Sequence, residues 1–213
     1  MIVVRYADDV VLGFQHENDA RRFLDAMRAR FEEFALQLHP DKTRLIEFGR
    51  HAAVGRKKRG LGKPETFDFL GFTHICGHCR RGLFQLKRKT RQDRVRGKLK
   101  EIKEELWRQM HRPIPEQGVW LAQVIRGFFA YHAVPTNFAA LSKFRRQIIW
   151  LWLRTLRRRS QRDNTPWTRM AKLAADFLPK PKILHPWPSV RFAAKDAPNN
   201  NRYEFGMSLG LMV

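Results

Sequence analysis

Two short apolar runs near the start of the chain enclose a pair of adjacent aspartates. The runs extend from Ile2 to Val4 and from Val10 to Leu12, and Asp8 and Asp9 lie between them. Apolar, β-branched runs on either side of a polar break predict a β-hairpin with the carboxylates near its turn. Successive strand side chains point to opposite faces, so both carboxylates can reach one ligand only where the backbone turns.

Two carboxylates at such a turn have two readings, an ordinary acidic turn or a metal site. Hard cations such as Mg²⁺ take oxygen ligands, and a carboxylate pair that also meets substrate phosphates is how polymerase-type sites hold them. The residues alone leave both readings open.

Charge is distributed unevenly along the 213 residues. The formal net charge is +22 and the pI is about 11.1. Residues 1–50 contain 8 Lys and Arg against 9 Asp and Glu, whereas residues 51–213 contain 34 against 11. Because cationic side chains that neutralise phosphates release counterions, this balance predicts a polyanionic partner. We therefore expect a nearly neutral segment with the acidic pair, joined to a strongly basic one.

The two cysteines and the apolar runs indicate a reducing setting. Two cysteines do not make a disulfide framework, and the N-terminus lacks a signal-peptide layout, so we expect a cytoplasmic protein. The most apolar run, Ile148 to Leu153, is far shorter than the roughly 20 residues of a membrane span, and we expect no membrane partner. Cys76-Gly77-His78-Cys79 lacks a second pair of zinc ligands, so we favour a hairpin turn with free thiols.

Hydrophobic periodicity predicts α+β architecture in the first part of the chain. Apolar residues at helical spacing predict an amphipathic helix over residues 18–38. Alternation predicts a strand over 42–48, and the Gly-rich basic stretch 50–63 predicts a mobile, exposed loop. A strand over 67–75 with an internal glycine, a turn at 77–82 and a strand at 83–86 would form a second hairpin.

From Lys87 onward the period becomes helical. One helix carries Val95, Leu99 and Ile102 on its apolar face and ends before Pro113. A second extends from residue 120 to near 135, a third follows Asn137 as N-cap, and a fourth begins at Thr165-Pro166. Residues 179–213 show no period. The predicted domains are therefore residues 1–86, a helical region 87–178 and an extended tail 179–213.

The tetrapeptide Tyr6-Ala7-Asp8-Asp9, with its flanking strands, the helix after it and the second hairpin, resembles the distal half of the reverse transcriptase palm. The resemblance implies that Asp8 and Asp9 are catalytic ligands of a two-metal Mg²⁺ site. It also implies that Tyr6 lies near the incoming nucleotide.

Two further motifs follow the order of that palm. His39-Pro40-Asp41-Lys42 resembles the next family motif, which implies a role for Lys42 near the leaving pyrophosphate; a solvated lysine after a turn is the alternative. The stretch Phe67 to Phe72 is similar to the primer-grip hairpin, which implies that Phe69, Leu70 and Gly71 lie near the primer 3′ end, although core packing would also explain the phenylalanines.

The helical region resembles the thumb, or maturase X domain, of group II intron-encoded reverse transcriptases. Matching stretches are Gly71 to Gly77, Arg126 to Pro135 followed by Asn137, and Arg157 to Gln161, so the resemblance covers most of residues 2–193. It implies an RNA-directed DNA polymerase and intron maturase. The implied partners are group II intron RNA or other structured RNA and an RNA/DNA template-primer.

Clusters of cations in the helical region are the expected RNA contacts. Like charges at helical i, i+3 and i, i+4 spacing destabilise a helix by a few tenths of a kcal/mol per pair unless a polyanion relieves them. A solvated basic face is the alternative. The candidate RNA-binding residues are Lys87, Arg88, Arg91, Arg94, Lys98, Arg145, Arg146, Arg154, Arg157, Arg158 and Arg159.

The resemblance leaves the metal site one carboxylate short. Phosphoryl transfer by two metals needs a further carboxylate, which the family supplies from a strand upstream of Tyr6-Ala7-Asp8-Asp9. We therefore expect no independent polymerisation, and a need for an N-terminal reverse transcriptase half or a second copy of the chain. The alternatives are an RNA-binding splicing cofactor without polymerase activity and an inactive fragment of a mobile element.

Overall fold

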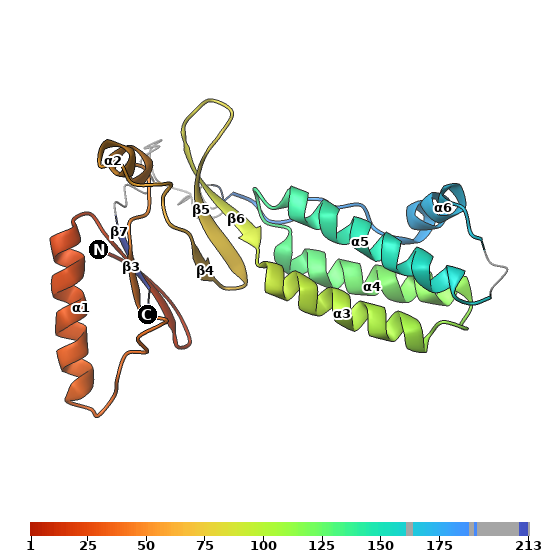
Figure 1. Ribbon diagram of the computed structural model, residues 1–213, viewed down its shortest axis with the longest axis horizontal. Helices are drawn as coiled ribbons and strands as arrows, with labels where there is room; N and C mark the ends of the chain where they lie inside the picture. Colours follow the sequence, from red (N-terminus) through yellow and green to blue (C-terminus); the bar gives the residue numbers. More distant parts are fainter. Residues whose placement is uncertain (161–163, 188–189, 191–208, 213) are drawn as a thin grey trace. The chain divides into compact units, whose positions relative to one another are not determined.

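The computed structural model describes residues 1–160, 164–187, 190 and 209–212 (Figure 1). Helices and two small sheets make the fold α+β, as predicted. The chain divides into two compact units. We call residues 1–87 with 194–213 the hairpin unit, and residues 88–193 the helical unit. Most of the predicted extended tail lies outside the described residues.

The first sheet of the hairpin unit is antiparallel. Its strand order is β1 (Ile2–Tyr6), β2 (Asp9–Phe14), β7 (Leu209–Met212) and β3 (Arg44–Ile46). β1 and β2 form the predicted hairpin. The last described residues of the chain therefore form a strand between β2 and β3, which the sequence pattern did not predict.

Helix α1 (Glu17–Glu32) packs on one face of this sheet (Figure 1). Leu12 and Phe14 of β2 are buried against Ala20 and Leu24 of the helix. Strand alternation places Leu12 and Phe14 on one face of β2, so that face is the side covered by α1. The small cluster is the core of this part of the molecule.

The end of α1 corrects the predicted helix over residues 18–38. The helix ends at Glu32 because Ala35 has a positive φ of 54°. The Leu36 N–H donates to the Phe31 carbonyl at 2.9 Å and the Ala35 N–H to the Glu32 carbonyl at 3.0 Å, which is the bond pattern of a Schellman cap. Alanine occupies the position that usually carries glycine, so the stop had no sequence signal.

A short helix, α2 (Ala52–Lys58), corrects the predicted loop over residues 50–63. Ala52 is buried, and Arg56 and Arg59 both form ion pairs with Glu47. Ion pairing to a carboxylate from elsewhere in the unit neutralises part of the basic run. This tertiary pairing outweighs the low helix propensity of Gly55.

The second sheet has the strand order β4 (Phe67–Phe69), β5 (Phe72–His78) and β6 (Phe84–Thr90). The predicted single strand over 67–75 is wrong, since Leu70 and Gly71 form a tight turn between β4 and β5. Both have positive φ, 48° and 74°, as a type I′ hairpin turn requires. The glycine thus marks a turn and not a bulge.

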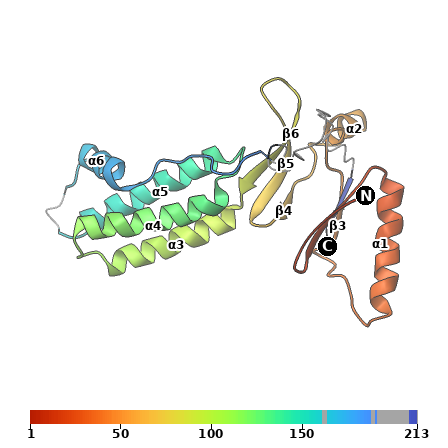
Figure 2. The same cartoon turned by 180° about the vertical axis from the view of Figure 1, so that it is seen from behind.

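The helical unit contains the four predicted helices, which are α3 (Gln92–Arg108), α4 (Ile114–His132), α5 (Phe138–Arg157) and α6 (Trp167–Phe177). Figures 1 and 2 show α3, α4 and α5 side by side along their lengths. Their shared core is apolar and includes fully buried large side chains, among them Ile102, Leu121, Ile125, Phe144 and Trp152.

Two buried amide side chains, those of Asn137 and Gln117, form hydrogen bonds with neighbouring elements. Asn137 is the N-cap residue of α5, as predicted, but its side chain makes no capping hydrogen bond. It accepts from the Thr90 N–H at 3.0 Å and donates to the Thr90 hydroxyl at 2.7 Å and the His132 carbonyl at 2.8 Å. Gln117 accepts from Trp152 Nε1 at 2.9 Å and donates to the Gln109 carbonyl at 2.6 Å. These bonds satisfy polar groups that would otherwise be costly to bury.

Two helix starts differ from the predictions. α4 begins at Ile114, so Pro115 lies in its first turn, where its missing N–H costs nothing. α6 begins at Trp167 with Pro166 before it, one residue later than predicted. Residue Thr165 is buried, and its carbonyl accepts two bonds from Arg157.

Candidate functional site

The acidic pair lies at the tip of the β1–β2 hairpin. Tyr6 and Asp9 are paired across the strands, and Ala7 and Asp8 form the two-residue connection. Ala7 has a φ of 52°, which favours glycine, and such backbone strain costs about 1–3 kcal/mol. Arg5 supports the turn, since its Nε donates to the Ala7 carbonyl at 3.0 Å. A strained turn that is held in place is typical of functional positions.

Strand alternation determines which face each side chain uses. Directly opposite residues of a hairpin share a face, so Tyr6 and Asp9 lie together. Asp9 lies on the opposite face of β2 from Leu12, and Leu12 packs on α1. Tyr6 and Asp9 therefore lie on the face away from α1, where the Tyr6 side chain is 64% exposed.

The donors at this tip suit a hard cation. Asp8 and Asp9 are exposed and adjacent, and carboxylate oxygens are ligands that Mg²⁺ prefers. Across the residues that the structure describes, no three His, Cys, Asp or Glu side chains gather closely enough to hold a metal ion. The hairpin thus offers two carboxylate ligands, and further ligands would have to come from substrate phosphates, water or another segment.

Lys42 and the β4–β5 turn occupy other parts of the hairpin unit. Lys42 is exposed in a turn in which its N–H donates to the His39 carbonyl at 3.2 Å. It forms no hydrogen bond or ion pair with Asp8 or Asp9, so the geometry gives no direct link to the acidic pair. Phe69, at the end of β4, and the turn residues Leu70 and Gly71 are half-buried.

The predicted RNA-binding cations near the start of α3 differ in exposure and in ion pairing. Lys87 and Arg94 are exposed, whereas Arg91 pairs with Asp93 at 2.7 Å and Lys98 with Glu101 at 2.8 Å. Arg88 is half-buried, and desolvation lowers its pKa from the ordinary value. Only part of this group is immediately available to phosphates.

The arginines of α5 and of the two residues that follow it divide in the same way. Arg145 donates to the carbonyls of Ala174, Leu178 and Pro179, which satisfies the C-terminal end of α6. Arg157 donates to the Thr165 carbonyl and Arg159 to the Arg112 carbonyl.

The other three arginines of this stretch, Arg146 and Arg154 on α5 and Arg158 at its C-cap, make no such hydrogen bonds to carbonyls within the described residues. Arg158 lies over the Trp107 ring, while Arg146 and Arg154 are exposed and have no ion-pair partner in the described part of the chain. Arg146, Arg154 and Arg158 are therefore the arginines of this stretch best placed to meet a ligand.

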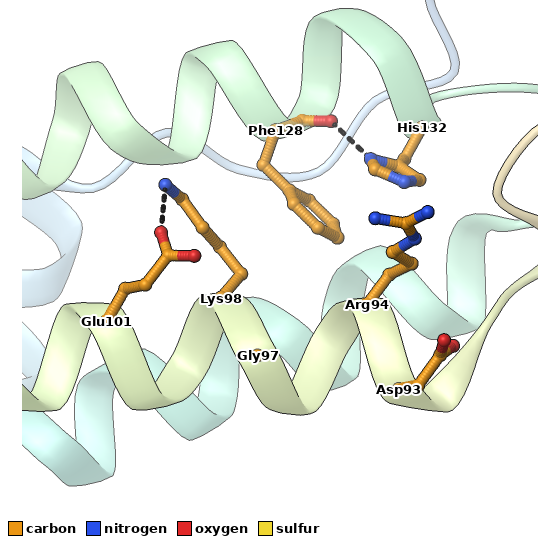
Figure 3. Close-up of a pocket in the computed structure, with 7 residues that line it drawn as sticks. All are labelled: Asp93, Arg94, Gly97, Lys98, Glu101, Phe128 and His132. Carbon is orange, nitrogen blue, oxygen red and sulfur yellow. Dashed lines mark hydrogen bonds and ion pairs between the residues drawn. The ribbon is translucent and has the colours of Figure 1, made fainter.

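Sequence reasoning missed a hollow between α3 and α4, shown in Figure 3. It has a volume of about 400 Å³ and is lined by Arg94, Gly97 and Lys98 on α3 and by Phe128 and His132 on α4, with the carboxylates of Asp93 and Glu101 at its edge. Gly97 opens the α3 side because no side chain fills it, a signal that the sequence did contain.

A stacked pair of rings forms the α4 side of this hollow. The centroids of the Phe128 and His132 rings are 4.1 Å apart, and His132 Nδ1 is 3.1 Å from the Phe128 carbonyl oxygen. Figure 3 shows the Arg94 guanidinium extending toward the His132 ring. Desolvation lowers the pKa of His132 despite the opposing effect of its backbone hydrogen bond, so its ring is held neutral to lower pH than an exposed histidine.

Comparison with known proteins bears on the hairpin unit. Residues 1–74 match the family model described as reverse transcriptase (RNA-dependent DNA polymerase). No curated protein and no solved structure matches the chain. Among the helices described, none is long and apolar enough to cross a membrane. The matched range contains the acidic hairpin, Lys42 and the β4–β5 turn, so residues 1–74 form part of a reverse transcriptase domain.

Proposed function

We propose that the chain is a portion of a group II intron-encoded reverse transcriptase and maturase. The observation that carries this proposal is the strained hairpin turn that presents Tyr6, Asp8 and Asp9 within the matched range 1–74. The helical unit that follows carries surface arginines, such as Arg146 and Arg154, that form no ion pair with any described residue, which supports an RNA-binding role for the remainder.

In this function the hairpin unit positions the reacting phosphates. Asp8 and Asp9 would hold Mg²⁺, which would supply positive charge to offset the negative charge of a nucleoside triphosphate. Tyr6, on the same face as Asp9, contacts the incoming nucleotide, and the β4–β5 turn contacts the primer end. Lys42 acts on the leaving pyrophosphate only if bound substrate brings the turn that carries Lys42 together with the acidic pair.

Metal binding tests the role of the acidic pair. Paramagnetic Mn²⁺ should broaden the amide NMR signals of residues 5–11 in the whole chain, and Asp8→Asn with Asp9→Asn should abolish that broadening. Asp25→Asn is the matched control, because Asp25 is an exposed α1 carboxylate paired with Arg28. Unchanged broadening in the double variant would refute the assignment.

Primer extension tests polymerase activity. Because the described residues bring only two carboxylates together, we expect no extension of an RNA/DNA template-primer by the chain alone. Extension that depends on Asp8, with Mg²⁺ and deoxynucleotides present, would contradict this expectation. Extension that appears only when an N-terminal reverse transcriptase half is added would identify the missing partner.

A second candidate function is RNA binding in splicing without polymerisation, which the free arginines of α5 favour. Binding of a group II intron RNA should weaken steeply with salt, with a log–log slope of about 0.7–0.9 per phosphate contact. Arg146→Gln and Arg154→Gln should each lower that slope by about one contact. Arg21→Gln on α1, paired with Glu17, should leave it unchanged.

Substitution of Asp8 and Asp9 distinguishes the two candidate functions. In the splicing-cofactor reading, Asp8→Asn and Asp9→Asn leave RNA binding and splicing intact. If the chain is a reverse transcriptase portion, the same substitutions leave RNA binding intact but abolish the metal-dependent extension that appears when an N-terminal reverse transcriptase half is added. A nearly salt-independent affinity would contradict both.

A further inference from the structure

An exposed tryptophan at the C-terminal end of α3 is surrounded by cations. Trp107 is 54% exposed, although large aromatic side chains usually hide most of their surface. Together with α5 residues it lines a hollow of about 150 Å³, whose charged lining residues are Lys103, Arg154 and Arg158. No carboxylate lines this hollow, unlike the one in Figure 3, where Asp93 and Glu101 would repel a phosphate.

The cations around Trp107 form no ion pairs with the described residues. The Arg158 guanidinium lies 5.1 Å from the centroid of the Trp107 ring, and it forms no hydrogen bond or ion pair with the described residues. Lys103 and Arg154 have no ion-pair partner within the part of the chain that the structure describes. By contrast, neighbouring cations of Lys103 on α3 are paired, Lys100 with Glu104 and Arg108 with Glu105.

An exposed ring with a planar cation beside it is suited to a nucleobase. Bases stack on tryptophan and on guanidinium planes, and the adjoining phosphates need nearby positive charge. The hollow has about the volume of five water molecules, at roughly 30 Å³ each, which suits one planar ring and excludes a folded helix of RNA. Stacking therefore fits an unpaired base better than a duplex.

We propose that Trp107 and Arg158 form a stacking site for one unpaired nucleobase of RNA, with Arg154 and Lys103 contacting the phosphates on either side of it. The inference rests on the proposed RNA-binding function and adds to it a preference for single-stranded segments. Trp107 makes the stacking contact, and Arg158 both covers the ring and neutralises the strand.

Two oligonucleotides with the same phosphates separate stacking from charge. The probes are a fluorescein-labelled oligouridylate of about ten nucleotides and its abasic counterpart, with binding to the whole chain measured by anisotropy. Wild-type protein should bind the oligouridylate about tenfold more tightly than the abasic strand. Trp107→Leu should remove this preference and leave the abasic affinity unchanged, while Trp107→Phe should keep most of it.

Matched variants make the result specific to this site. Trp150→Leu is the control, because Trp150 is 48% exposed on α5 but stacks on Trp167 outside the hollow. Arg154→Gln should weaken both oligonucleotides equally, as loss of a phosphate contact would. Circular dichroism melting of Trp107→Leu and Trp107→Phe checks that each variant is folded.

The remaining outcomes overturn either the stacking site alone or the RNA-binding function together with it. Equal wild-type affinity for the two oligonucleotides, with a steep salt dependence, would overturn the stacking site and leave RNA binding in place. Equal loss of affinity for both in Trp107→Leu would also overturn it. Failure of wild-type protein to bind either oligonucleotide or intron RNA would overturn the proposed RNA-binding function together with the stacking site.

Discussion

The hairpin unit and the helical unit of this protein are packed very differently. In the hairpin unit, the core beneath the acidic turn is formed by Leu12, Phe14, Ala20 and Leu24, and all of β1 is exposed. In the helical unit, residues from four helices share one continuous core, with Phe144 and Trp152 fully buried. The part that matches the reverse transcriptase family model is therefore the part with the smaller core.

This contrast indicates that the two units differ in stability. Burial of large side chains supplies most of the favourable free energy of folding, so the helical unit should be the stable body of the molecule. All six tryptophans belong to the helical unit, which makes tryptophan fluorescence a selective probe of its unfolding. Three predictions test the contrast, in order of decreasing effect.

The largest expected effect comes from the helical core. Phe144→Ala should lower the free energy of unfolding of this unit by about 3–5 kcal/mol, because Phe144 is fully buried and stacks on Phe128 at 3.8 Å. Urea titration followed by tryptophan fluorescence measures it. Leu12→Ala, its counterpart in the hairpin unit, should leave that fluorescence transition in place while hydrogen exchange in β1 and β2 accelerates. A shift of the fluorescence midpoint in Leu12→Ala would show that the units unfold together.

A smaller effect is expected at the buried amide before α5. Asn137→Ala should cost about 1–3 kcal/mol, because it leaves the buried Thr90 N–H without its acceptor. The same urea titration measures the loss. Asn164→Ala, at an exposed position of the same unit, should change the free energy by less than about 0.5 kcal/mol. Equal effects of the two substitutions would contradict a structural role for Asn137.

The smallest effect concerns pH. Burial lowers the pKa of His132 in the folded state, so below about pH 6.5, the ordinary histidine value, the unfolded chain binds a proton more readily than the folded one. Stability of the helical unit should therefore fall as the pH drops through that value and hold above it. His132→Phe, which can still stack on Phe128, should flatten the fluorescence-detected decline. A decline of the same size in His132→Phe would assign it to other groups.

Much of the fold could be read from periodicity. The hairpin around the acidic pair and the apolar faces of α3, α4 and α5 follow from patterns that repeat over many residues, where one misplaced side chain matters little. The ends of elements were predicted less well. The stop of α1 depends on Ala35 adopting a conformation that favours glycine, and α2 depends on ion pairs to Glu47, which lies before the helix and beyond the i, i+4 spacing of helical periodicity.

Candidate sites show the same limit. The sequence identified the carboxylates and the basic clusters, but it could not separate arginines that satisfy carbonyls, such as Arg145 and Arg157, from those that are free, such as Arg154. It also did not indicate the hollow beside Trp107, because that hollow joins residues of α3 and α5 that are about forty to fifty positions apart in the chain.

By itself, the sequence determined the chemical inventory of this protein: two adjacent carboxylates between apolar strands, a surplus of cations and a set of amphipathic helices. The tertiary structure decided which face Asp9 and Tyr6 share, which carbonyls the arginines satisfy and which ring remains exposed among cations. Composition and periodicity are local properties of the chain. Burial and pairing depend on contacts between distant segments, and only folding creates those contacts.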